Sequence, residues 1–97
     1  MMDEIKEELL ELEFNADSIG LVYWIEAIKY IRNNPLSWDV MAIYEHIASE
    51  FNTTKTRAER NLRNAITPAK KNIQEKYKYY RPIRNQTFLN LIRYELI

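Results

Sequence analysis

The stretch HIASEFNTTKTRAERNL, residues 46–62, contains two apolar helical segments separated by a short polar turn. Ile47 and Phe51 stand about one helical turn apart before the polar residues, and Ala58 and Leu62 stand about one turn apart after them. This spacing places each pair on one face of a helix. The stretch therefore predicts two helices that pack against each other across a sharp turn.

The turn has residues suited to its role. Asn52 tolerates the positive φ that a sharp turn requires. Thr53 or Thr54 can cap the helix that follows, whereas Thr56 and Glu59 match a capping box that would begin the same helix later. The sequence therefore does not decide between these starts, which differ by one or two residues.

Apolar residues at helical spacing also run through most of the remaining chain, and no segment shows convincing strand alternation. One glycine and three prolines among 97 residues also favour helices. We therefore predict an all-α fold of about six helices in a single compact domain, residues 1–97, with a helix-turn-helix at about residues 38–66. The expected helices cover residues 3–13, 18–32, 38–51, 54–66, 68–80 and 87–97.

Three helix starts have recognisable capping residues. Asp17 or Ser18 can cap the second helix, and Ser37 is expected to cap the third. Pro68 cannot donate a backbone hydrogen bond, so Thr67 and Pro68 can serve as the N-cap and first residue of the fifth helix.

Composition excludes several classes of function. The chain has no cysteine, so a disulfide or a thiolate metal site is impossible. Its one glycine cannot build a phosphate-binding loop, and His46, the single histidine, is expected to be solvated. We therefore expect no catalytic residues, no cofactor, no metal and no small-molecule substrate. No apolar run could span a bilayer, so we expect a soluble, cytoplasmic protein with no membrane partner.

The zero net charge hides a division between the two halves of the chain. Residues 1–50 carry eleven acidic and three basic side chains, whereas residues 51–97 carry eleven basic and three acidic ones. Such asymmetry suggests a face that binds a polyanion. The alternative is that the acidic half neutralises the basic half across the fold.

The helix after the turn divides into an apolar face and a cationic face when it is drawn at 100° per residue. Five residues are expected to face the core: Ala58, Leu62, Ala65, Ile66 and Ala69. The opposite face holds Arg60, Asn64 and Thr67, flanked by Arg57, Thr56 and Arg63. Arginine can pair with guanine and asparagine with adenine in the major groove, so the face could read bases. An ordinary solvated helix face has a similar composition.

Three segments carry a family resemblance: IYEHIASEFNTTKTRAERNLRNAI, IGLVYWIEAIKYI and NQTFLNLIRYEL. Together they resemble the C-terminal effector domain of the sporulation initiation response regulator of endospore-forming bacteria, over roughly residues 8–97. The resemblance implies a six-helix DNA-binding domain that regulates transcription. It also implies double-stranded promoter boxes as the partner, with a homodimer on DNA or the transcription machinery as further partners.

The resemblance also implies which residues contact DNA. The expected base-reading residues are Arg57, Glu59, Arg60, Arg63 and Asn64, although Asn64 stands where the family usually has histidine. The expected phosphate contacts are Thr53, Thr54, Lys55, Thr56, Lys70 and Lys71. Pro68 departs from the family pattern and is expected to shorten or kink the recognition helix.

A second hypothesis is a protein-interaction module that forms a heterodimer with a full-length regulator or antagonises it. Its supports are the zero net charge, the acidic segment 3–13 and the expected absence of a receiver domain before it. A DNA-binding domain and a pure partner-binding domain differ in their salt dependence. DNA binding weakens steeply with salt because counterions are released.

Overall fold

The computed structural model describes residues 2–36 and 38–96, with the side chains of residues 2, 3, 95 and 96 outside the description. This part of the chain is helical and contains no strand, which confirms the all-α prediction. The elements are α1 (Met2–Glu11), α2 (Ile19–Asn33), α3 (Val40–Glu50), α4 (Lys55–Ile66), a 3₁₀ turn (Thr67–Ala69), α5 (Lys70–Tyr77) and α6 (Asn85–Leu96).

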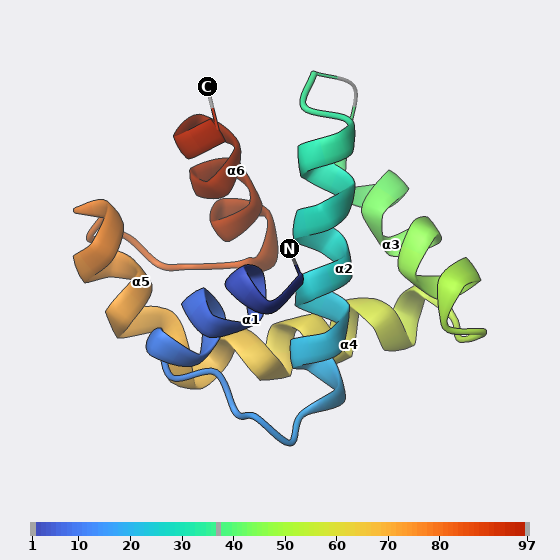
Figure 1. Ribbon diagram of the computed structural model, residues 1–97, viewed down its shortest axis with the longest axis horizontal. Coiled ribbons are helices and arrows are strands. Elements are labelled where there is room, and N and C mark those ends of the chain that lie inside the picture. The colour runs from blue at the N-terminus through green and yellow to red at the C-terminus, as the bar shows by residue number, and fades with distance from the viewer. Residues whose placement is uncertain (1, 37, 97) are drawn as a thin grey trace.

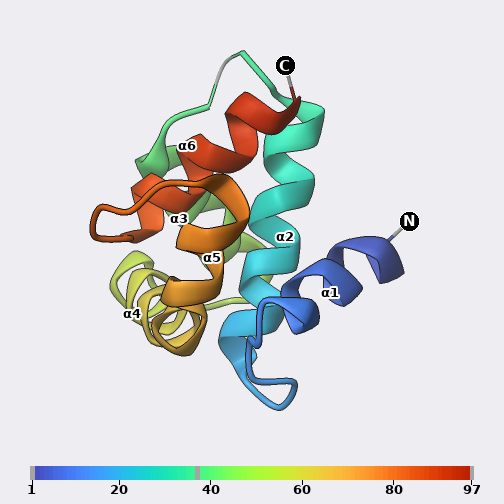
Figure 2. The ribbon, with the colours of Figure 1, turned by 90° about the vertical axis from the view of Figure 1, so that its left-hand side faces the viewer.

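The longest helix, α2, lies at the centre of the arrangement. Helix α4 crosses it, and α3, α1 and α6 also pack against it (Figure 1). A quarter turn of the view shows α1 and α4 on opposite sides of α2 (Figure 2). Helix α2 is therefore the central helix, against which α1, α3, α4 and α6 pack.

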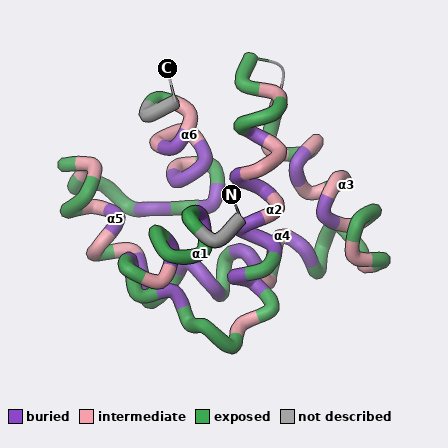
Figure 3. Tube along the Cα trace, viewed as in Figure 1, coloured by how far each residue is buried: buried purple, intermediate pink, exposed green. Residues whose placement is uncertain are grey.

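The core is built from the apolar faces that helical spacing predicted. Residues Leu21, Trp24, Ile25, Ile28 and Ile31 of α2 are all buried. Figure 3 shows buried stretches on the helices and on the segment that connects α5 to α6, where Ile83 is 1% exposed. None of the helices in residues 2–36 and 38–96 combines the length and the apolar character that crossing a bilayer would require.

The crossing of α2 and α4 is held by a close backbone approach and a buried hydrogen bond. A Cβ atom added at Gly20 would overlap the carbonyl oxygen of Asn61 and the Cβ of Ala65. Four residues further along α2, the Trp24 Nε1–H donates to the carbonyl oxygen of Leu62 at 2.9 Å. The single glycine of the chain is thus required by helix packing.

Several predicted boundaries were wrong, each for a local reason. Helix α3 begins at Val40, because the Asp39 side chain accepts from the backbone N–H of Ala42 and caps it. Ser37, the expected cap, lies outside the described residues. In the first helix, α1 ends at Glu11, and Glu13 has a left-handed φ of 71°.

The region around Pro68 also differs from the prediction. The Thr67 hydroxyl does not cap a new helix; it donates to the carbonyl oxygen of Arg63 at 2.9 Å. Residues 67–69 form a 3₁₀ turn that leads from α4 into α5 at an angle (Figure 1). Helix α5 then ends at Tyr77, because Lys78 is left-handed with a φ of 54°.

The last helix is longer at its start than predicted, since α6 begins at Asn85. Phe88 and Ile92 are buried, as expected, and Leu89 joins them in the core. Leu91 is only partly buried, and the side chain of Leu96 lies outside the described residues.

We predict that Gly20→Ala lowers the free energy of unfolding by about 1–3 kcal/mol, because the added methyl group forces α2 away from α4. Chemical denaturation would measure this change. Alanine is the better helix former, so a loss of stability must come from the crossing. Asn33→Ala, at an exposed position of α2, is the control and should change stability by less than about 0.5 kcal/mol. A Gly20→Ala protein as stable as the parent would contradict the tight crossing.

Candidate nucleic-acid interface

The turn between α3 and α4 is fixed by backbone hydrogen bonds. Asn52 adopts a φ of 51°, the left-handed conformation expected for it. The backbone N–H of Phe51 donates to Ile47 at 3.0 Å, and that of Thr53 donates to Ala48 at 2.9 Å. These bonds satisfy carbonyl groups at the end of α3 and set the direction in which the chain enters α4.

Thr54 caps α4. Its Oγ1 accepts from the backbone N–H of Arg57 at 3.1 Å, and its carbonyl oxygen accepts from the N–H of Ala58 at 2.9 Å. The side-chain bond satisfies one of the backbone donors that a helix start leaves unpaired. Of the three candidate caps, Thr53, Thr54 and Thr56, the structure has Thr54, and Thr56 lies inside the helix.

The inner face of α4 is completely covered. The five residues expected to face the core, Ala58, Leu62, Ala65, Ile66 and Ala69, are between 0% and 3% exposed. Three of these are alanines: Ala58 and Ala65 lie in α4 and Ala69 in the following 3₁₀ turn, and their small side chains let α4 lie close to its neighbours. Because this face is fixed in the core, the opposite face of α4 has a defined orientation toward solvent.

The outer face of α4 carries the cations. Arg57, Arg60, Arg63 and Asn64 are all exposed, and none of them is covered by another part of the described chain. Lys55 and Thr56, in the first turn of the helix, are exposed as well. The side chains expected to read bases are therefore available to a partner, with Glu59 as the exception.

Glu59 lies at the edge of this face and is only partly exposed. Its Oε2 is 3.7 Å from Nε of Arg63, and the two side chains are 35% and 58% exposed. A pair this open to solvent contributes little to stability, about 0–1 kcal/mol. Glu59 could therefore release Arg63 at low cost when a partner approaches.

A hollow of about 500 Å³ lies beside Glu59, between α4 and the start of α6. Its lining includes Tyr44, Glu59, Arg63, Lys70 and Asn85. Burial raises the pKa of the Tyr44 hydroxyl, an effect that the Asn85 hydrogen bond opposes. The hydroxyl therefore remains protonated at neutral pH, and Asn85 Nδ2 donates to it at 3.3 Å.

The expected phosphate contacts do not all have the same exposure. Lys71 is exposed, whereas Lys70 is half-buried and lines the hollow. Thr54 is exposed, but its hydroxyl oxygen already accepts the capping bond; Thr53 is half-buried. Lys55, Thr56 and Lys71 thus have the freest side chains of the set.

Comparison with known protein families identifies the family of this chain. The family described as "Sporulation initiation factor Spo0A C terminal" matches residues 5–94. The chain belongs to this family. Spo0A C-terminal domains are DNA-binding effector domains in sporulation regulation, rather than a class of enzymes. Comparisons with curated proteins and with solved structures gave no match.

His46 is not solvated as predicted. The ring is half-buried rather than solvated, and its Nε2 lies 2.8 Å from Oε2 of Glu26. The ring also packs against Tyr30, with the ring centroids 4.8 Å apart. Because Glu26 is on α2, twenty residues away, only the packing of α2 on α3 brings the two together. The one signal available was the spacing of His46 and Glu50, which places both on the same face of α3.

Thr54→Ala should lower the free energy of unfolding by about 0.5–2 kcal/mol, since the backbone N–H of Arg57 loses its acceptor. Urea denaturation monitored by circular dichroism would give the value. Thr56→Ala is the matched control and should be nearly neutral, because Thr56 is exposed inside the helix. A larger loss for Thr56→Ala than for Thr54→Ala would show that the helix is capped later in the chain.

Proposed function

We propose that this protein binds double-stranded DNA sequence-specifically and regulates transcription by placing α4 in the major groove. In this proposal α3, the turn and α4 act as a helix-turn-helix, with α3 crossing the sugar-phosphate backbone. The observation that carries it is the division of α4 into a buried apolar face and an exposed face of arginine and asparagine.

The dimensions of α4 suit this role. Its 12 residues give a length of about 18 Å, and the major groove, about 12 Å wide, admits a helix. Arg60 and Asn64 are four residues apart, so both project from one side of the helix. Arginine can make two hydrogen bonds to guanine, and asparagine can make two to adenine.

The flanking residues have separate tasks in the proposal. Arg57 and Arg63 lie on either side of Arg60 and would reach neighbouring bases. Glu59 would accept from a cytosine amino group after leaving Arg63. Thr53, Thr54, Lys55, Thr56, Lys70 and Lys71 would contact phosphates and fix the register of the protein on the duplex. The backbone N–H groups at the start of α4 add donors for a phosphate.

The partner would be a promoter that contains short repeated boxes, and two copies of the chain could occupy adjacent boxes. The protein would act in the cytoplasm. A competing proposal is a module that binds a full-length regulator through protein contacts. The exposed apolar side chains of Ile19 and Val22 on α2 favour it, because they offer an uncovered apolar surface.

Arg60→Ala should weaken binding to a selected site by about 1–3 kcal/mol and relax the base preference at one position. The site would first be selected from a random duplex pool with the parent protein, and affinities would then be measured on selected and random duplexes. Arg32→Ala, an exposed arginine of α2, is the matched control and should bind as the parent does. Equal losses on selected and random DNA for Arg60→Ala would contradict base reading.

Lys71→Ala should weaken binding to all duplexes alike. It should also reduce the slope of the logarithm of the association constant against the logarithm of the salt concentration by about 1, which corresponds to one lost phosphate contact. An electrophoretic shift assay over a range of salt concentrations would measure both effects. If the parent protein binds no duplex at any salt concentration, the DNA-binding proposal fails and the partner-binding one is favoured.

A further inference from the structure

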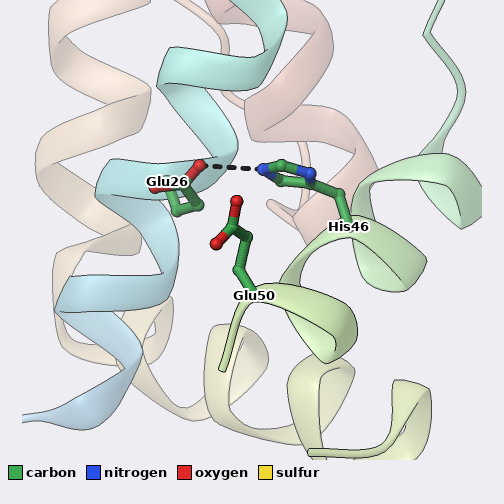
Figure 4. A group of neighbouring side chains, drawn as sticks. All are labelled: Glu26, His46 and Glu50. Carbon is green, nitrogen blue, oxygen red and sulfur yellow. Dashed lines mark hydrogen bonds and ion pairs between the residues drawn. The ribbon is translucent and has the colours of Figure 1, made fainter. Parts of the chain in front are cut away.

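Three side chains that could bind a metal ion meet where α2 packs against α3. Glu26 comes from α2, and His46 and Glu50 come from adjacent turns of α3 (Figure 4). One ligand atom from each lies within 4.8 Å of the other two. These residues are away from the cationic face of α4 and have no role in the DNA-binding proposal.

We propose that Glu26, His46 and Glu50 form a site for a divalent first-row transition metal, with Zn²⁺ as the preferred ion. An imidazole nitrogen with two carboxylate oxygens suits Zn²⁺, whereas Ca²⁺ and Mg²⁺ prefer oxygen ligands alone. Three protein ligands and one water would complete a tetrahedral shell.

The geometry requires only small movements. In a tetrahedral zinc site with bonds of about 2.0–2.1 Å, ligand atoms lie about 3.3 Å from one another. His46 Nε2 and Glu26 Oε2 are 2.8 Å apart, so these two atoms would separate slightly as the ion enters between them. Glu50 is exposed, so its side chain can turn toward them and supply the remaining movement.

The surroundings hold two of the ligands in position. Tyr30 packs against the His46 ring, and Lys29 Nζ lies 3.7 Å from Oε1 of Glu26. Lys29 therefore contacts the carboxylate oxygen that His46 does not use, which leaves Oε2 facing the ring. The Glu26 and His46 side chains are 21% and 27% exposed, so an ion can enter from solvent and a water can remain bound.

The other interpretation is a structural hydrogen bond between Glu26 and His46, with Glu50 nearby by chance. The two interpretations differ at Glu50, because in the described part of the chain the bond joins Glu26 and His46 alone, and Glu50 lies within 4.8 Å of both without forming part of it. Removing the Glu50 carboxylate weakens a metal site and leaves the hydrogen bond intact. The sole histidine of the chain makes the distinction measurable, since its ring signals in NMR spectra arise from His46 alone.

The test is a calorimetric titration of the tag-free chain with Zn²⁺, accompanied by NMR of the His46 ring and by Co²⁺ absorption spectra. The parent should bind one equivalent of Zn²⁺ at His46. Glu50→Gln and His46→Gln should each weaken binding by about tenfold or more, a loss at least as large as that seen for outer-shell partners. Glu45→Gln removes one exposed acid of the same helix outside the cluster and should bind Zn²⁺ as the parent does. Mg²⁺ and Ca²⁺ should leave the His46 signals unchanged.

Circular dichroism would confirm that each variant keeps its helix content, so that weak binding is not mistaken for unfolding. The proposal is overturned if the parent takes up no stoichiometric Zn²⁺. It is also overturned if Glu50→Gln binds as tightly as Glu45→Gln, or if bound Zn²⁺ leaves the His46 ring signals in place. The last result would assign the ion to the acidic side chains of α1 or to another surface.

Discussion

The crossing of α2 and α4 at Gly20 determines the rest of the arrangement. Only a residue without a Cβ allows the backbone of α2 to lie against Asn61 and Ala65. The buried bond from Trp24 to the Leu62 carbonyl then fixes the rotation of α4 about its own axis. A helix held in both distance and rotation presents one defined face outward, and in this chain that face carries Arg60 and Asn64.

This constraint explains why the outer face of α4 can be polar without loss of stability. Ala58, Leu62, Ala65 and Ile66 are fully or almost fully buried, so the apolar area of the helix is already covered. The arginines on the opposite face bury little apolar surface, and their ion pairs within the chain are weak. The solvent-exposed pair of Arg63 and Glu59 is an example. Their side chains remain free for a polyanion, whose charge would repay the ordering of these long side chains.

The sequence predicted contacts within one helix better than contacts between helices. The two faces of α4, the left-handed Asn52 and the cap at Thr54 follow from local spacing and side-chain chemistry, and all were confirmed. The cap of α3 at Asp39 was not predicted, because serine and aspartate are about equally good capping residues and Ser37 precedes it. The Glu26–His46 contact could not be predicted, since it depends on how α2 and α3 rotate against each other. Which of the exposed residues contact DNA stays a prediction, because exposure alone does not distinguish a reading face from a solvated one.

Helix α2 connects the two sites. Near its start, α2 contacts α4 through Gly20 and Trp24. In its middle, Glu26 of α2 bonds to His46 of α3. The angle between α3 and α4 is therefore set by two contacts to the same rigid helix as well as by the turn that joins them. A bound ion at Glu26, His46 and Glu50 would strengthen the α2–α3 contact without touching α4. Any effect of such an ion on the outer face of α4 would pass through α2 or through α3, which packs directly against α4 and is joined to it by the turn at Asn52.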